Sequence, residues 1–197
     1  AGNSGYKGFF YHFLRNDDGT RYKTNELSTV DTSLFLGGAL FAQSYYDRND
    51  PVEAEIRDLA EKIYTRVDWT FVQRTNTGTE ATNLAGSHGI TMGWKPEKGF
   101  ETHDWVGYNE GMLVYVLALG SPTHPVGKDA WDQGWAAELE KDWGSYYGQQ
   151  HLQFEPLFGH QYSHVWVDFR GIRDDFMRGK GIDYFGNSRR ATLAQRG

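Results

Sequence analysis

The chain contains no cysteine, no long hydrophobic run and no excess of basic residues. Without cysteine, the chain has no disulfide scaffold, no thiolate metal site and no cysteine nucleophile. No apolar run approaches the roughly 20 residues that a membrane-spanning helix needs, so a transmembrane protein is not expected. The 20 Lys and Arg against 26 Asp and Glu give a net charge of −6. This balance argues against a nucleic-acid partner, because phosphate binding relies on clustered basic side chains.

Aromatic residues are abundant: the 197 residues include 7 Trp, 12 Tyr and 12 Phe, beside 24 Gly. This composition excludes a disordered chain and suits one domain or a segment of a larger one. Trp and Tyr combine apolar faces with polar rims, so they can stack on sugar rings, although an aromatic core is the simpler interpretation. The sequence starts at Ala1 without a signal segment, so we expect either processing or a piece of a longer polypeptide.

Hydrophobic periodicity predicts a mainly α-helical unit. The first helix is apolar nearly all round and is expected to be buried inside a larger assembly, whereas the second has one apolar stripe. A small β excursion is predicted at 69–74 and 90–94, with a polar loop at 75–89 between them. The predicted helices span 26–46, 50–66, 108–119, 128–147, 158–170 and 183–195.

Several catalytic motifs are missing from the sequence, including the nucleophile elbow, the phosphate loop and the dinucleotide fingerprint. His160 and His164 lie four residues apart, within zinc-binding reach on one helix face. However, the zinc-protease pattern needs Glu at the position of Gln161. We therefore favour two histidines that hydrogen-bond within a polar groove, and we expect no metal.

Two glutamates stand at the predicted starts of apolar helices, Glu26 before the first helix and Glu110 before the third. Burial of a carboxylate beside an apolar helix is costly unless it is paired or faces a wet cleft. Two acids that enter one cleft are what glycoside hydrolysis requires, one to protonate the leaving oxygen and one to act as nucleophile or base. Helix capping is the alternative for each glutamate taken singly.

Five motifs carry a resemblance to a known family. They are GFFYHF at 8–13, ELSTVDT at 26–32, WVGYNE at 105–110, LALGSPTHP at 117–125 and QYSHVWVDFR at 161–170. In these motifs and in their order, the chain resembles the bacterial glycoamylase-like ("putative glucoamylase") family. That family is similar to bacterial β-1,2-glucanases and to the transglycosylase domain of cyclic β-1,2-glucan synthases.

The resemblance implies an all-α fold, an (α/α)6 toroid of twelve helices around a substrate cleft. Because only six helices are predicted here, residues 1–197 are expected to form a single segment of an incomplete catalytic domain, whose other helices would be a partner. The implied function is a glycoside hydrolase or transglycosidase that acts on a glucan oligosaccharide or polysaccharide. A β-1,2-linked glucan is expected, and no cofactor is expected. A periplasmic or secreted location is expected. The alternative is a non-catalytic glucan-binding or incomplete domain.

The resemblance also implies roles for individual residues. Glu26 is the candidate general acid, and Glu110 is the candidate nucleophile or base. We predict that their carboxyl carbons lie within roughly 10 Å of each other, and that His164 and Asp168 share a helix face lining the cleft, with Trp166 turned away. Asp31, Asp104, His164 and Asp168 are the candidates for hydrogen bonds to substrate, and Trp94, Trp105, Tyr108, Tyr162 and Trp166 are the candidates for stacking on glucose.

Overall fold

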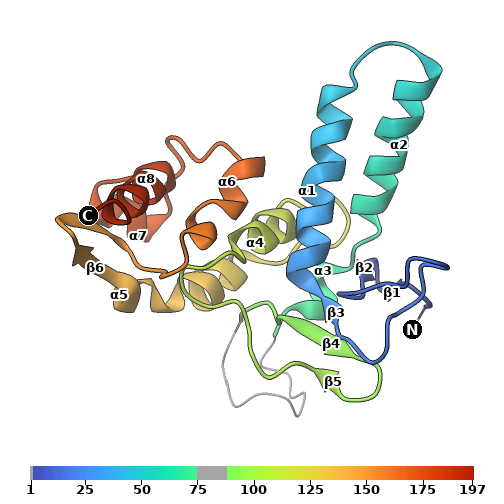
Figure 1. Cartoon of the computed structure of the whole chain (residues 1–197), viewed down its shortest axis with the longest axis horizontal. Helices are drawn as coiled ribbons and strands as arrows, with labels where there is room; N and C mark the ends of the chain where they lie inside the picture. Colours follow the sequence, from blue (N-terminus) through green and yellow to red (C-terminus); the bar gives the residue numbers. More distant parts are fainter. Residues whose placement is uncertain (1, 75–87) are drawn as a thin grey trace.

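The computed structural model describes residues 2–74 and 88–197 (Figure 1). The N-terminal half contains two long helices that stand side by side, and the C-terminal half gathers shorter helices around its own hairpin. The helices are α1 (Thr29–Tyr45), α2 (Pro51–Thr65), α3 (Trp69–Val72), α4 (Met112–Leu119), α5 (Leu139–Asp142), α6 (Tyr162–Trp166), α7 (Asp175–Lys180) and α8 (Tyr184–Ala194). A π-helical turn η1 (Ala130–Gly134) and 3-10 turns η2 (Trp135–Glu138) and η3 (Leu157–His160) complete the helical part.

Within the described residues, three small antiparallel sheets accompany the helices. β1 (Gly5–Tyr6) pairs with β2 (Phe9–Phe10), and β6 (Trp143–Tyr146) pairs with β7 (Gln149–Leu152). The third sheet has the order β3 (Leu27–Ser28), β4 (Gly93–Lys95), β5 (Gly99–Phe100). The mainly helical prediction with a small β excursion is therefore confirmed.

Local capping signals explain α1 and α2. Asp50 caps α2, and its carboxylate accepts from the backbone N–H groups of Val52 and Glu53, with Pro51 at the first helical position. This start agrees with the prediction. α1 begins at Thr29 and not at residue 26, because Leu27 and Ser28 pair with β4 and Ser28 then caps the helix.

The predicted β excursion is found only in part. Residues 69–72 form the single helical turn α3 and not a strand, but the two predicted segments still meet in an antiparallel bridge between Gln73 and Ile90. The strand β4 pairs with β3 and β5. Trp69 has no exposed surface, and this aromatic anchor lies in the hydrophobic core. The loop predicted at 75–89 lies outside the described residues except for its last two.

The long helix predicted over 128–147 is also wrong. The chain forms η1, η2 and α5 in succession and then turns into the β6–β7 hairpin at Tyr147 and Gly148, both with positive φ. The indole of Trp135, within η2, is fully buried, and its carbonyl accepts from the N–H of Gly107. A straight helix cannot make these contacts together with a hairpin.

Two further corrections concern the C-terminal half. The helix predicted over 158–170 is η3 followed by the short α6, which ends at Trp166 because Val167 is extended. Asp168 therefore lies in the loop after the helix and not on its face. α7 was not predicted, although Asp174 caps it and Gly181 ends it in the left-handed conformation.

Packing brings α1 against α2, α4 and α6. Within the described residues α1 is covered on one face only, and its burial inside a larger assembly stays a prediction. Its glycine face is covered, whereas Phe35, Phe41 and Tyr45 are exposed. None of the helices in the described ranges is long and apolar enough to cross a membrane.

Candidate active site

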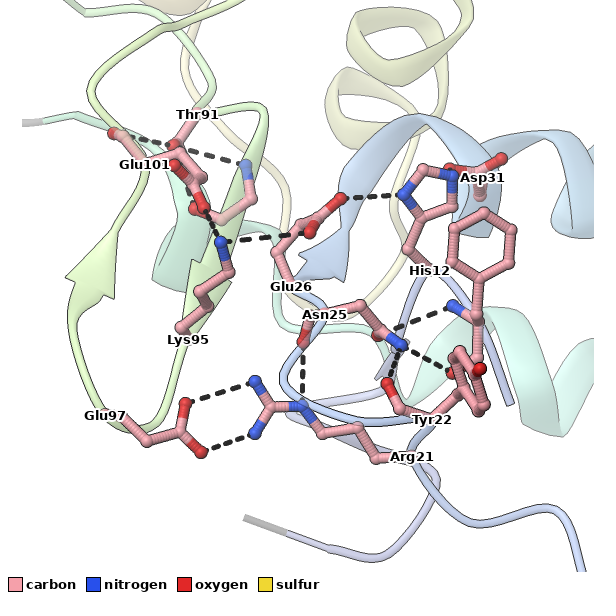
Figure 2. Close-up of polar contacts among 12 residues, drawn as sticks. His12, Arg21, Tyr22, Asn25, Glu26, Asp31, Thr91, Lys95, Glu97 and Glu101 are labelled. Carbon is pink, nitrogen blue, oxygen red and sulfur yellow. Dashed lines mark hydrogen bonds and ion pairs between the residues drawn. The ribbon is translucent and has the colours of Figure 1, made fainter. Parts of the chain in front are cut away.

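Glu26 lies in a cluster of charged side chains just before β3 (Figure 2). The Nδ1 of His12 is 2.7 Å from Oε1 of Glu26, and its Nε2 is 3.4 Å from Oδ2 of Asp31. Ser28 also donates its hydroxyl to Asp31, at 2.5 Å. One imidazole thus bridges two carboxylates that lie five positions apart in the sequence. We call His12, Glu26, Asp31 and Lys95 the carboxylate cluster.

Lys95 approaches the cluster from β4. Its Nζ is 4.0 Å from Oε2 of Glu26 and 2.7 Å from Oε1 of Glu101. Partial burial raises the pKa of the Glu26 carboxyl, but its own backbone N–H, His12 and Lys95 outweigh burial, so the pKa lies below its usual value. Glu26 is therefore ionised at neutral pH.

The backbone around Glu26 holds its side chain in place. Leu27 pairs with Trp94 in the β3–β4 register. A Cβ on Gly93 would lie 3.0 Å from Cγ of Glu26, so the glycine leaves room for the Glu26 side chain. On the other side, the N–H of His12 donates to the Glu26 carbonyl at 2.8 Å. Strand pairing thus fixes both the acid and its histidine partner.

Glu110 lies two residues before α4, where Gly111 is the N-cap, so it precedes the helix and does not cap it. Its Oε2 is buried and has no hydrogen-bond partner among the described residues. A Cβ on Gly111 would lie 2.6 Å from the Trp105 indole, so this turn packs directly on the ring. Trp105 in turn donates from Nε1 to Oγ1 of Thr29, at 2.9 Å. Trp105 thereby links the start of α4 to Thr29, the first residue of α1, which lies three residues after Glu26.

The start of α4 also contacts α6. The N–H of Leu113 donates to Oγ of Ser163 at 3.0 Å, and the Trp166 indole lies against Gly37 of α1. The segment that carries Glu110 is therefore linked through Trp105 to Thr29, the first residue of α1, and it contacts α6 directly. Neither Glu26 nor Glu110 caps a helix, which corrects the premise that each opens one.

Three of the predicted substrate contacts are buried. Asp104 binds the guanidinium of Arg74 at 2.9 Å, inside the protein. Trp105 lies beneath Gly111, and Tyr108 is stacked on His160 with ring centroids 4.7 Å apart. A fourth, Trp94, stacks on Tyr6 at 5.2 Å. These side chains have protein partners in the structure and support the backbone near the glutamates.

Three of the other predicted contacts line a groove of about 910 Å³ between α6 and α8. His164, Trp166 and Asp168 all face it, although Asp168 does so from the loop and pairs with Arg170 at 2.7 Å. Tyr162 is half-exposed at its end of α6 and packs on Phe158. The structure thus brings the predicted residues together in two places, at the carboxylate cluster and along this groove.

The two histidines considered for zinc have few polar partners. Burial lowers the pKa of His160 to about 4, helped by nearby His151, and burial lowers that of His164 to about 4 as well. Neither ring nitrogen of His160 has a hydrogen-bond partner within the described ranges. Over the same residues, no group of three His, Asp or Glu side chains could hold a metal ion.

Residue-by-residue reasoning did not find His12 and Lys95. His12 was visible only as part of the GFFYHF motif, and its contact with Glu26 depends on strand register. Lys95 comes directly after the strand predicted at 90–94. No local sequence pattern indicates its contact with Glu26, which lies 69 positions earlier.

Comparison with known proteins supports the resemblance. The model of the family described as "Putative glucoamylase" matches residues 102–197. The chain is 25% identical, over 97% of its length, to an exo β-1,2-glucooligosaccharide sophorohydrolase of Parabacteroides distasonis. It superposes over 98% of its length on the structure of a putative glucoamylase from Bacteroides uniformis, with 25% identity and a TM-score of 0.79. An endo-β-1,2-glucanase from Chitinophaga pinensis shares the fold over the same fraction, with 23% identity and a TM-score of 0.79.

The chain spans only part of each relative: 29% of the sophorohydrolase and 46% of each of these two solved chains. The matched region nevertheless contains Glu110 and the complete QYSHVWVDFR motif. Residues 102–197 of this chain match the model of the putative glucoamylase family, in agreement with the resemblance that the sequence motifs carry.

Proposed function

We propose that this chain forms part of the catalytic domain of a glycoside hydrolase or transglycosidase that acts on β-1,2-linked glucan. The observation that carries the proposal is the carboxylate cluster, linked through Thr29 and Trp105 to the Glu110 segment, in a chain similar to a β-1,2-glucooligosaccharide hydrolase. Two carboxylates that enter one site are the machinery of glycoside hydrolysis. A polymeric glucan also suits a periplasmic or secreted enzyme, which completes the proposal.

The charged groups around Glu26 favour a different assignment of the two glutamates' catalytic roles from the one predicted from the sequence. The lowered pKa keeps Glu26 ionised, which suits a base, a nucleophile or a group that binds hydroxyls, and does not suit a general acid. The proton donor is then assigned to Glu110, whose buried Oε2 has no hydrogen-bond partner among the described residues and would find one in a substrate oxygen. His12 and Lys95 hold the Glu26 carboxylate in its charged form.

The proposal includes a larger fold. The side-by-side packing of α1 with α2, α4 and α6 suits a segment of an (α/α)6 toroid, and residues 1–197 would form one segment of that domain. Further helices would complete the cleft, because the chain covers 46% of similar solved chains. This coverage also supports a second candidate, a segment that binds glucan but does not cleave it without those helices.

The test is the release of reducing ends from β-1,2-glucan by the full-length protein. Glu26→Gln and Glu110→Gln should each lower kcat by orders of magnitude while leaving glucan binding and thermal unfolding nearly unchanged. Asp58→Asn is the matched control, because Asp58 is an exposed acid on α2 that pairs with Lys62. Near-normal turnover by either Gln variant would remove that glutamate from the mechanism.

The roles can be separated by chemical rescue. An external nucleophile such as azide restores turnover when the missing carboxylate is the nucleophile or base, and an activated substrate with a good leaving group bypasses a missing general acid. We therefore expect the activated substrate to rescue Glu110→Gln and not Glu26→Gln. The reverse pattern would restore the original assignment. Binding without turnover by the wild-type full-length protein would favour the non-catalytic candidate.

A further inference from the structure

Phe13 and Tyr22 present exposed aromatic rings next to the carboxylate cluster. Phe13 is 56% exposed and Tyr22 is 46% exposed. They lie opposite each other on a hairpin, since Leu14 bridges to Arg21 and the N–H of Tyr22 donates to the Phe13 carbonyl at 2.9 Å. We call these two side chains the aromatic shelf.

The shelf is held firmly by the hairpin beneath it. The side-chain amide of Asn25 donates to the carbonyls of both Phe13 and Tyr22, and its oxygen accepts from the N–H of Phe13 (Figure 2). Arg21, in the second arm of the hairpin, donates from Nε to the carbonyl of Asn25 at 2.7 Å. Binding on a preorganised surface avoids much of the cost of ordering the side chains.

The shelf continues directly from the candidate site. The His12 ring stacks on Phe13 with centroids 4.1 Å apart and an interplanar angle of 13°. The same imidazole is the group that contacts Glu26 and Asp31. One face of Phe13 is thus covered by His12, so its exposed surface is the opposite face and the edge, directed away from the carboxylates.

A groove of about 620 Å³ runs beside the shelf. The groove is lined by the two rings, by Leu14 and by three polar residues, Arg15, Asn16 and Asp17. The Arg15 guanidinium pairs with Asp17 at 2.7 Å, so the lining is polar without a free positive charge. Aromatic faces beside neutralised polar groups suit the C–H faces and hydroxyls of a sugar, and do not suit a polyanion.

We propose that the aromatic shelf is a binding subsite for pyranose rings of the glucan chain, beyond the rings that contact Glu26. The inference rests on the proposed function and extends it, since it assigns substrate contacts to Phe13 and Tyr22. A glucan chain that extends from Glu26 past His12 reaches the exposed edge and the far face of the Phe13 ring. Long glucans therefore gain contacts on the shelf that the shortest ones do not reach.

The test compares affinities of the full-length protein for β-1,2-glucooligosaccharides of increasing length, by calorimetry. Phe13→Ala and Tyr22→Ala should each weaken binding of the long oligosaccharides about tenfold and leave the disaccharide nearly unchanged. Phe13→Trp should retain the long-chain affinity, because it keeps a stacking face. Tyr147→Ala is the matched control, since it removes an exposed aromatic ring from the β6–β7 turn.

A second measurement asks whether the shelf is open in the full-length protein. Tyr22→Cys introduces a thiol into a segment that contains none, and mass spectrometry can locate its labelling. We expect rapid labelling that a long oligosaccharide slows. Slow labelling without glucan would show that another segment covers the shelf, and would overturn the proposal.

The outcomes separate the shelf from the proposed function. Glucan binding by the wild type that neither alanine variant weakens would overturn the shelf and leave the function standing. An equal loss at every chain length would also overturn it, because a remote subsite cannot act on the disaccharide. If the wild type bound no glucan, both would fall together.

Discussion

His12 and His160 place the same side chain in opposite surroundings. His12 is partly exposed and contacts two carboxylates, at 2.7 and 3.4 Å. His160 is 1% exposed, and its ring nitrogens have no hydrogen-bond partner among the described residues. The first environment favours a polar contact with a ligand, and the second makes protonation costly. Because burial disfavours the protonated form of His160, this residue should change how the free energy of unfolding depends on pH.

His160 should make the protein less stable in mild acid. An unfolded histidine titrates near 6.5, whereas burial lowers the pKa of His160 to about 4. Between these values the unfolded chain binds a proton that the folded chain does not, so stability falls as the pH drops from about 6.5 to about 4. The limiting slope is about 1.4 kcal/mol per pH unit for each such histidine.

Urea unfolding at pH 7 and pH 5 tests this effect. His160→Phe should lose less stability between the two pH values than the wild type does, with a residual slope from His164, whose pKa is also lowered to about 4. His124→Gln is the control, because His124 is exposed. An unchanged slope in His160→Phe would show that His160 does not contribute.

At the scale of elements, the contact between α1 and α6 depends on one glycine. A Cβ on Gly37 would lie 2.9 Å from two atoms of the Trp166 indole, whereas a Cβ on Gly38 would lie 3.8 Å from the same ring. The first distance is a clash and the second is an ordinary contact. Two adjacent glycines in one helix therefore provide a matched pair.

Gly37→Ala should destabilise the protein by about 1–3 kcal/mol, because α6 must shift away from α1. Gly38→Ala should stabilise it by about 0.5–1 kcal/mol, because alanine loses less backbone entropy in a helix. Denaturant midpoints measure both changes. Equal effects of the two substitutions would contradict the close packing of Trp166 on Gly37.

At the scale of the whole molecule, α1 leaves an aromatic surface uncovered. Phe41 and Tyr45 stack on each other with centroids 6.1 Å apart, and both are more than half exposed. Clustered apolar side chains on a protein surface mark a site of association. In the proposed toroid, further helices would cover this surface.

The 197-residue chain should therefore self-associate when it is produced without additional segments. Sedimentation velocity should show species larger than a monomer, and Phe41→Ser with Tyr45→Ser should shift the distribution toward the monomer. Lys62→Ser is the control, because Lys62 is an exposed polar residue on α2. A monodisperse wild-type monomer would show that this surface does not drive association.

Short-range chemistry accounts for what could be predicted without coordinates. α2 follows from Asp50, Pro51 and one apolar stripe, all within a few turns of chain, and the structure agrees within a residue or two. Glu26 and Glu110 were singled out because carboxylates beside apolar helices are costly, and three of the five family motifs lie within residues 102–197, which the family model matches. Capping, periodicity and composition act locally, so one sequence is enough to reveal them.

Contacts between distant segments decided the rest. Trp69 belongs to a helical turn and not to a strand because its ring is buried in the core, and periodicity over four residues does not resolve that choice. The partners of Glu26 are His12 and Lys95, which strand pairing brings together from 14 positions before it and 69 positions after it. The lowered pKa of Glu26, and hence its proposed role, depends on this arrangement. Such charges act through space, so the fold, and not the order of residues, determines which of them meet.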